Sequence, residues 1–334
     1  MRDIFEFKNN FSAYRDVVSV LKIGNKDLIP NPKVSIVMPV CSHPDYFELA
    51  LKTAINQDYN GEYEIVIVDN DDSLGITKNQ VVVEKNYTTN LLYYKNATNI
   101  GMFGNWNRCI ELARAPYIVF LHDDDLLLTN ALSTLMYIQK STGDKAIFTA
   151  FHTINAEGEF INKASAVSSK FGIFKCKSVF RYSLFDQFLH SAGFGCGCLF
   201  CKQKMLEIGG YDPEFYPSAD YALQACYTYK YGSVYCTIPT FKYREAENES
   251  LKVYQQFAEV DRHFRSCMKK HLVMPKFVLD RIIKANYNIS KIRFLIRWGK
   301  QDPSLVKKIK WSDKVVMRIA NMIANMKHYE IKKF

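Results

Sequence analysis

Short, apolar, β-branched runs alternate with helical stretches along the first part of the chain, and this alternation constrains the fold more than any other feature. Such runs predict buried strands, here over 34–41, 63–69, 91–94 and 117–121. Helical stretches occupy the intervals 45–57, 75–86 and 102–114. Strands that alternate with helices in this way predict an α/β fold, with a mostly parallel central sheet flanked by helices.

The rest of the chain is less regular. Further strands are predicted over 146–154, 194–201 and 234–243, and helices over 219–231, 251–271, 276–298 and 312–329. Prolines at positions 30 and 32 mark an extended entry into the α/β domain. We therefore expect an N-terminal arm, one α/β domain in two halves and a helical C-terminal extension, with the boundaries 1–31, 32–130, 131–250 and 251–334.

Two acidic clusters, 69–72 and 123–125, directly follow predicted strands. Ligands of parallel sheets bind at the carboxyl ends of the strands. Adjacent carboxylates raise one another's pKa, and a divalent cation with oxygen preference relieves that repulsion. One aspartate is enough to cap the helix that could follow residue 125. Three in a row therefore favour a site for Mn²⁺ or Mg²⁺ and a phosphate group.

A set of segments in a fixed order resembles a known family. The segments are VSIVMPV at 34–40, IVIVD at 65–69, NIG at 99–101, Asn107 and YIVFLHDDD at 117–125. Their order and spacing over 33–245 are similar to those of the family 2 glycosyltransferases, which have the GT-A fold. The resemblance implies that 32–250 is a catalytic domain, with a nucleotide-sugar half followed by an acceptor half.

The resemblance also assigns roles around the donor, a UDP-sugar. Asp69 matches the aspartate that hydrogen-bonds uracil. The other matched positions line or flank the nucleotide-sugar pocket, and they are Pro39, Val40, Cys41, Asn99, Gly101 and Asn107.

The run from His122 to Asp125 matches the Asp-x-Asp motif of the family. Alignment without gaps makes Asp124 the metal ligand and puts Asp125 beside it, whereas a motif read from Asp123 makes Asp125 the ligand. Both alternatives stay open. His122 stands where the family often has aspartate, and it either contacts the ribose or a phosphate or packs at the strand end.

An inverting transfer needs a carboxylate that accepts the proton of the acceptor hydroxyl. In the family this residue follows a Gly-Gly-aromatic-Asp turn, here Gly209 to Asp212, and the matching position is Asp220. Ala219 departs from the glutamate that usually precedes the base. Asp220 also suits the start of the helix predicted over 219–231, and both roles are compatible. The acceptor implied is a hydroxyl of a glycan or of a lipid-linked saccharide.

The nine cysteines include a C-x-C-x-x-C group at Cys196, Cys198 and Cys201. A zinc site needs further ligands, usually a second pair, and none is evident. The resemblance instead puts this small-residue strand beside the acceptor pocket, with His190 and Ser191 before it. The odd number of cysteines, the lack of an apolar leader and the lack of a spanning apolar stretch lead us to expect a cytoplasmic protein.

The net charge of +10 is concentrated at one end. Residues 262–334 hold 19 Lys and Arg against 4 Asp and Glu. An apolar stripe along 312–329 accompanies this charge. One interpretation is docking on the anionic inner face of the cell membrane; the other is packing against the body or in a homodimer. Nucleic acid is not expected, because no basic-aromatic recognition motif is present.

Two other functions share part of the pattern. A nucleotidyltransferase would need a glycine-rich basic loop after the first strand, where this chain has SHPD at 42–45. A non-catalytic sugar-nucleotide-binding partner of another transferase is consistent with Ala219. The sequence therefore favours a metal-assisted glycosyltransferase over both.

Overall fold

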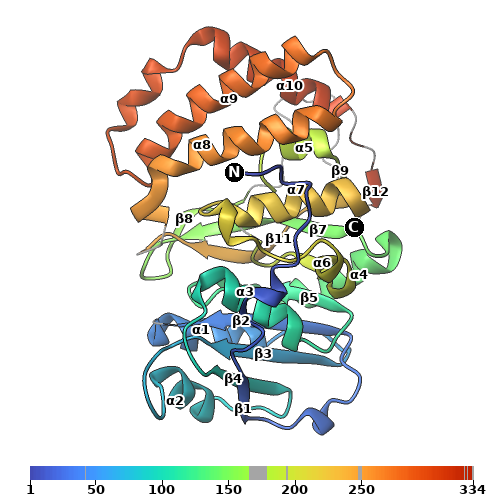
Figure 1. Ribbon diagram of the computed structural model, residues 1–334, viewed down its shortest axis with the longest axis vertical. Helices are drawn as coiled ribbons and strands as arrows, with labels where there is room; N and C mark the ends of the chain where they lie inside the picture. Colours follow the sequence, from blue (N-terminus) through green and yellow to red (C-terminus); the bar gives the residue numbers. More distant parts are fainter. Residues whose placement is uncertain are drawn as a thin grey trace.

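The computed structural model describes residues 1–41, 43–164, 179–192, 195–246, 250–326, 328 and 330–332. A 12-stranded sheet runs through the molecule, with helices on its faces (Figure 1). The main path of the sheet has the order β1-β4-β3-β2-β5-β10-β7-β11-β9-β12, with β6 on β11 and β8 on β7.

The parallel part of the sheet matches the alternation predicted from the sequence. Its strands are β2 (Val34–Val40), β3 (Tyr63–Asp69), β4 (Leu91–Asn96) and β5 (Tyr117–Phe120). Helices α1 (Pro44–Ile55), α2 (Lys78–Lys85) and α3 (Gly101–Leu112) connect them. All residues of β2 are buried, because helices cover both faces of this strand. The α/β prediction is confirmed.

The N-terminal segment belongs to the same body. Strand β1 (Ser19–Ile23) pairs antiparallel with β4 at the edge of the sheet. Ahead of it, the chain runs up the molecule, and Ile4 is buried in the core near the C-terminal helices (Figure 1). The sequence did not reveal β1, since its five residues alternate in exposure at an edge.

The second half of the sheet mixes orientations. Strands β7 (Ala146–Ile154) and β11 (Ser233–Arg244) are parallel neighbours, and β10 (Leu199–Cys201) lies antiparallel between β5 and β7. The smaller strands are β6 (Leu126–Leu127), β8 (Phe160–Asn162) and β9 (Val179–Tyr182). The helices are α4 (Ala131–Thr142), α5 (Leu184–Leu189), α6 (Lys202–Glu207) and the largely buried α7 (Ala219–Tyr231).

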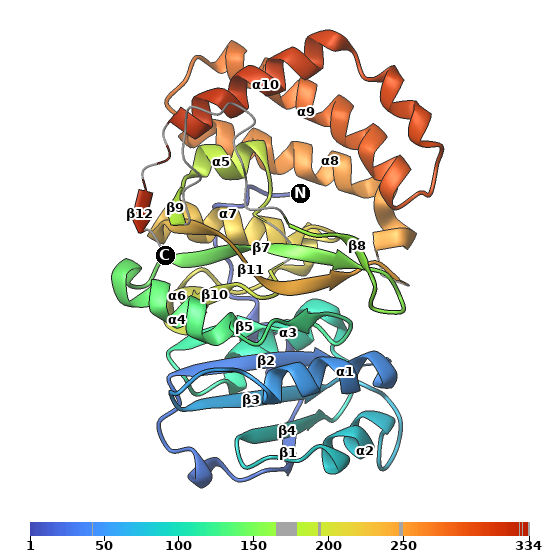
Figure 2. The ribbon, with the colours of Figure 1, turned by 180° about the vertical axis from the view of Figure 1, so that it is seen from behind.

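Three C-terminal helices form a layer at the end of the molecule opposite β1 (Figure 2). They are α8 (Ser250–Met268), α9 (Lys276–Arg297) and α10 (Trp311–Met326). Strand β12 (Glu330–Lys332) then pairs with β9. Short 3-10 helices are η1 (Phe11–Tyr14), η2 (Lys26–Leu28), η3 (Pro213–Phe215), η4 (Lys269–His271) and η5 (Pro303–Lys308). Among the described residues, no helix has the length and apolarity needed to cross a bilayer.

Helix α10 packs through a face that differs from the predicted apolar stripe. Its buried residues are Asp313, Met317, Ala320 and Ala324. Within the predicted stripe, Val316 and Ile323 pack against the core, whereas Ile319, Met322 and Met326 are exposed. The small alanines allow α10 to lie close to its neighbours, so the bulkier apolar residues remain on the outside.

Candidate active site

A large cavity of about 1060 Å³ opens between the parallel part of the sheet and the C-terminal helices. One side is formed by residues that follow β2, β3 and β5, at the carboxyl ends where parallel sheets bind ligands. The opposite side is formed by α8, α9 and α10. Helix α7 contributes its first turn. Segments far apart in the chain thus meet at one site.

The acidic turn after β5 divides into two parts. His122, Asp123 and Asp124 line the cavity, and each is half-buried. Asp123 receives a hydrogen bond from the backbone of Cys41, at the end of β2. Asp125 is fully buried and is not part of the cavity lining. Of the two alternatives for the metal ligand, only Asp124 is thus on the cavity wall.

Arg244 of β11 holds the acidic turn in place. Its backbone N–H donates to Oδ1 of Asp125 over 2.9 Å, and its Nε donates to the carbonyl oxygen of Asp124 over 2.8 Å. This guanidinium is nearly fully buried and lies 4.6 Å from the ring centroid of Tyr46. The sequence did not point to Arg244, because 119 residues separate it from Asp125.

The carboxylates of the turn suit a divalent cation. Burial raises the pKa of Asp124 to about 8, and the neighbouring Asp125 and Asp123 add to the rise. Burial also raises the pKa of Asp123. Oxygen ligands that face a cavity and repel one another favour Mg²⁺ or Mn²⁺, which keeps positions for substrate phosphates. Asp123 and Asp124 therefore fit a metal shared with a diphosphate.

A second group with metal-ligand chemistry lies beneath the turn. One potential ligand atom from each of His122, Asp125 and Cys196 falls within 4.8 Å of the others. Oδ2 of Asp125 has no hydrogen-bond partner, and it is 3.6 Å from Nδ1 of His122. Among the described residues Cys196 thus groups with the acidic turn rather than with Cys198 and Cys201.

His122 is held against Trp106 of α3. The two rings stack with centroids 4.7 Å apart and planes at 20°. Burial lowers the pKa of His122, but the carboxylates of Asp125, Asp124 and Asp123 outweigh it, so the net shift is upward. His122 thus packs at the strand end, as one of the two alternatives predicts, and it also borders the cavity; its contact with a ribose or phosphate stays a prediction.

Pro39, Val40 and Cys41 line the cavity as predicted, but Asp69 does not. Asp69 is fully buried, and its Oδ2 accepts hydrogen bonds from the hydroxyls of Thr77 (2.7 Å) and Tyr93 (2.6 Å). These hydrogen bonds hold the carboxylate of Asp69 inside the protein, away from the cavity lining. A role for Asp69 at uracil remains a prediction from the resemblance.

The adjacent Asn70 borders the cavity instead, although it is not among the predicted site residues. Its Nδ2 donates to Oδ1 of Asn99 over 2.8 Å, and its Oδ1 accepts from the backbone of Ile100 over 3.0 Å. Asn99 lines the cavity, whereas Gly101 begins α3 outside the cavity lining. The sequence does contain a signal for Asn70, because this residue directly follows β3, at the strand end where parallel sheets bind ligands.

Asn107 is also placed away from the cavity. Its side chain donates to the carbonyl of Tyr211 and accepts from the N–H of Tyr211, both over 2.8 Å. A Cβ on Gly210 would lie 2.4 Å from Oδ1 of Asn107, so only glycine fits there. Asn107 thus secures the Gly-Gly-Tyr-Asp turn that precedes Asp220.

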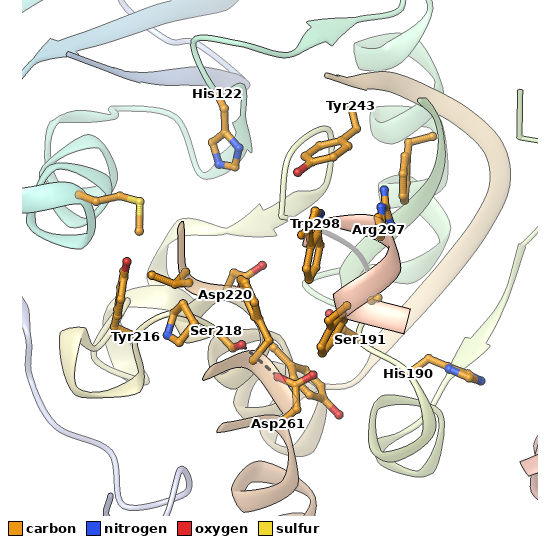
Figure 3. Close-up of a pocket in the computed structure, with 18 of the residues that line it drawn as sticks. His122, His190, Ser191, Tyr216, Ser218, Asp220, Tyr243, Asp261, Arg297 and Trp298 are labelled. Atoms are coloured by element: carbon orange, nitrogen blue, oxygen red, sulfur yellow. Dashed lines mark hydrogen bonds between the residues drawn. The ribbon is translucent and has the colours of Figure 1, made fainter. Parts of the chain in front are cut away.

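Asp220 lines the cavity from the second residue of α7 (Figure 3). The N-cap residue is Ser218, whose hydroxyl donates to Oδ1 of Asp261 over 3.0 Å instead of capping the helix. Burial raises the pKa of Asp220 to about 6, and the nearby Asp261 adds to the rise. A cavity-facing carboxylate with this pKa is suited to accept a proton near neutral pH.

The C-terminal helices give the cavity an aromatic wall that the sequence did not reveal. Trp298 stacks on Phe294 with centroids 4.8 Å apart and planes at 18°, and Phe257 lies 4.8 Å from Trp298. Figure 3 shows Trp298 close to Tyr243 and Arg297. His190 and Ser191, predicted from the resemblance to flank the acceptor, also line the cavity.

Solved structures show a similar fold. The chain superposes on TarS 1–349 of S. aureus with a TM-score of 0.57 and 15% identity, covering 86% of this chain and 78% of that one. A second TarS 1–349 structure, in complex with UDP-GlcNAc, gives a TM-score of 0.55. The mannosyltransferase PcManGT of Pyrobaculum calidifontis, in complex with GDP-Man and Mn²⁺, gives a TM-score of 0.50 at 14% identity. The GT-A fold is thereby confirmed.

Curated relatives match over part of the chain's length. The GalNAc(5)-diNAcBac-PP-undecaprenol beta-1,3-glucosyltransferase of Campylobacter jejuni is 31% identical over 186 residues, 55% of this chain and 56% of that protein. The abequosyltransferase RfbV of Salmonella typhimurium is 29% identical over 112 residues, covering 33% of this chain and 34% of RfbV. The chain thus spans a little over half of the first of these.

The family model for glycosyl transferase family 2 matches residues 35–207, which include β2, the acidic turn and β10. This segment is more than half of the 334-residue chain. The match agrees with the GT-A fold, with the acidic turn at a strand end and with the resemblance stated from the sequence. The chain therefore belongs to glycosyl transferase family 2.

Proposed function

We propose that the protein is an inverting glycosyltransferase that moves a sugar from a UDP-sugar to a hydroxyl of a glycan or lipid-linked saccharide. The observation that carries this proposal is that Asp124 and Asp220 line one cavity, the first from the turn after β5 and the second from α7. UDP as the nucleotide is supported by the TarS complexes with UDP and UDP-GlcNAc. A lipid-linked acceptor is supported by the name of the Campylobacter relative, a GalNAc(5)-diNAcBac-PP-undecaprenol glucosyltransferase.

The acidic turn is proposed to bind the diphosphate end of the donor. Asp124, with Asp123 beside it, would hold Mn²⁺ or Mg²⁺, which supplies positive charge for the departing diphosphate. Arg244 fixes the backbone of the turn, so the carboxylates need little rearrangement. His122, held on Trp106, lies next to these carboxylates and can donate to a ribose or phosphate oxygen.

Asp220 is proposed to act as the base. Its carboxylate accepts the proton as the acceptor hydroxyl attacks the anomeric carbon on the side opposite the diphosphate, so the configuration inverts. Asp261 and Ser218, joined by their hydrogen bond, line the same cavity. Ala219 is buried and does not line the cavity, so the departure from the usual glutamate leaves Asp220 as the carboxylate that α7 presents.

The proposal is tested by release of UDP from a panel of UDP-sugars in the presence of Mn²⁺. We expect one donor to be hydrolysed slowly without an acceptor and faster with a saccharide acceptor. NMR of the product would give the anomeric configuration. Retention of configuration, or release of UDP from none of the sugars, would contradict the proposal.

The dependence of the rate on pH follows from Asp220. A carboxylate with a pKa of about 6 is mostly protonated at pH 5 and mostly ionised at pH 7. Only the ionised form accepts a proton, so kcat is expected to rise about tenfold between about pH 5 and pH 7 and then to level off. The measurement is kcat at saturating donor and Mn²⁺. A flat profile over this range would indicate an ordinary or a non-essential carboxylate.

We also propose that α10 docks on the anionic inner face of the cell membrane. Trp311 and Met326 are 78% and 77% exposed. They share one face of α10 with Ile319 and Met322, opposite the buried face. Basic residues flank this face at Lys307, Lys308, Lys310, Lys314 and Arg318. An exposed apolar face with a basic margin is typical of helices that lie in a membrane interface.

The double substitution Ile319→Ser and Met322→Ser is expected to lower binding to vesicles severalfold, because it removes apolar area from the membrane-facing side. Both side chains are about half exposed, so folding should persist. The measurement is co-sedimentation with vesicles that contain phosphatidylglycerol. Val81→Ser on α2, also exposed, is the control. Equal sedimentation of all three proteins would favour a contact between protein copies, which analytical ultracentrifugation would detect.

A further inference from the structure

The part of the cavity beyond Asp220 has its own wall, formed by the C-terminal helices. On α9 the lining residues recur at helical spacing, so a single face of the helix borders the cavity. Arg293 lies on this face, between Ile289 and Arg297. Arg265 reaches the same region from α8. This wall is separate from the turn that carries Asp123 and Asp124.

The charge on this wall is mostly positive. Four cationic side chains border the cavity here, and they are Lys252, Arg265, Arg293 and Arg297. The carboxylate that these helices contribute to the lining is Asp261. The donor end carries the opposite sign through Asp123 and Asp124. A single cavity therefore has an acidic end and a basic end.

The pairing of these cations leaves Arg293 uncompensated. Arg297 forms an ion pair with Glu245, and Arg265 lies 3.7 Å from Asp261, which also accepts the hydroxyl of Ser218. Within the part of the chain that the structure describes, Arg293 has neither an ion-pair nor a hydrogen-bond partner. Burial, Arg265 and Arg293 lower the pKa of His190, whereas its hydrogen bond with Asn321 and the carboxylate of Asp186 raise it.

The chemistry of this wall selects a phosphate. Guanidinium groups bind phosphate oxygens with paired, charge-assisted hydrogen bonds. Nε2 of His190 donates to Oδ1 of Asn321 over 2.8 Å, and the lowered pKa of His190 keeps this ring neutral near pH 7. Trp298, which stacks on Phe294 and is 9% exposed, contributes aromatic surface to the same cavity lining. A saccharide that carries a phosphate fits these surfaces, with its phosphate at the arginines and its sugar ring at Trp298.

We infer that the acceptor is a phosphate-bearing saccharide, whose phosphate binds Arg293 and Arg265 while its sugar lies along Trp298 toward Asp220. This inference rests on the proposed function and adds the acceptor's chemical class to it. The phosphate belongs either to a diphosphate-linked lipid carrier or to a phosphodiester-linked glycan. Both present the same anionic group beside a sugar.

The test uses ligand-observed ³¹P NMR on the full chain saturated with UDP and Mn²⁺, with N-acetylglucosamine 1-phosphate as the probe. We expect the probe to bind about tenfold more tightly than neutral N-acetylglucosamine. The affinity of the neutral sugar, which has no phosphorus, is measured by calorimetry. Arg293→Ala should weaken the probe about tenfold and leave UDP affinity unchanged. Lys291→Ala is the matched control, because it removes a cation from the same helix outside the cavity.

Each outcome decides a different point. Unchanged probe affinity in Arg293→Ala would overturn the inference. Equal weakening of UDP in that variant would assign Arg293 to the donor diphosphate and would also overturn it. If the unmodified chain does not bind UDP, the proposed function is contradicted. If the same chain still binds the probe in a way that depends on Arg293, the phosphate subsite is retained. Transfer to a diphosphate-linked lipid or to a phosphodiester glycan then separates the two sources.

Discussion

Asp220→Asn is expected to lower kcat for sugar transfer about a thousandfold and to leave the affinity for UDP and Mn²⁺ within about twofold. The amide keeps the size of the side chain but accepts no proton at neutral pH. Asp220 lines the cavity from α7, which is a different element from the acidic turn. The donor site should therefore be undisturbed. The measurements are steady-state UDP release with acceptor and calorimetry with UDP.

Asp280→Asn serves as the control for this variant. Asp280 is an exposed carboxylate of α9 that pairs with Lys269 at the surface, and a surface pair contributes little to stability. Its removal should change neither kcat nor UDP affinity. Transfer by Asp220→Asn at a rate within about threefold of the unmodified chain would exclude Asp220 as the base. A loss of UDP affinity would instead show that the carboxylate holds the donor.

The sequence predicted the strands of the first half closely, because their physical signal is strong. The runs that form β2 and β3 are almost entirely apolar and buried, and few other structures accommodate such runs. The carboxyl ends of adjacent parallel strands meet at one edge, so the location of the site followed from the strands alone. Strand β1 carried no such signal, since it is short and half exposed at the edge.

The sequence could not decide which side chains face the cavity. Asp69 and Asn70 are neighbours, yet Asp69 is held by Thr77 and Tyr93 inside the protein and Asn70 borders the cavity. The direction of each side chain depends on partners that are distant in the sequence. Asn107 illustrates this, because its partner Tyr211 lies 104 residues away.

The acceptor side was the least predictable part. Its wall comes from one face each of α8, α9 and α10, and helical periodicity alone does not tell which apolar face meets a cavity and which meets the core. The sequence showed an excess of positive charge at this end of the chain. The structure divides that charge between the cavity, where Arg265 and Arg293 lie, and the outer surface near Lys314 of α10.

Asp124→Ala is expected to remove the metal dependence of UDP binding. In the unmodified chain, Mn²⁺ should strengthen UDP binding at least about a hundredfold, because the ion joins the carboxylate to the diphosphate. In the variant the affinities with and without Mn²⁺ should agree within about twofold. Calorimetry with UDP, in Mn²⁺ and in EDTA, measures both. A retained metal effect would contradict the assignment of Asp124.

The stability of the metal-free chain gives an independent readout. The pKa of Asp124 in the folded chain is about 8, above the ordinary value of 3.8, so the folded state holds this proton more tightly than the unfolded state. Stability due to this group is therefore lost as pH rises between those values. Removal of the carboxylate should raise the unfolding temperature of the metal-free chain at about pH 7.5. In the presence of Mn²⁺, addition of EDTA should no longer lower the unfolding temperature of this variant.

Asp125→Asn separates the two aspartates that the sequence left as alternatives. Asp125 is fully buried, with Oδ1 accepting from Arg244 and Oδ2 near His122, so its substitution disturbs the turn from below. We expect the free energy of unfolding to fall by about 1–3 kcal/mol, while Mn²⁺ still strengthens UDP binding more than about tenfold. If Asp125→Asn instead loses the metal effect and Asp124→Ala keeps it, the ligand is Asp125. The cavity-facing position of Asp124 then gives no guide to metal binding in this chain.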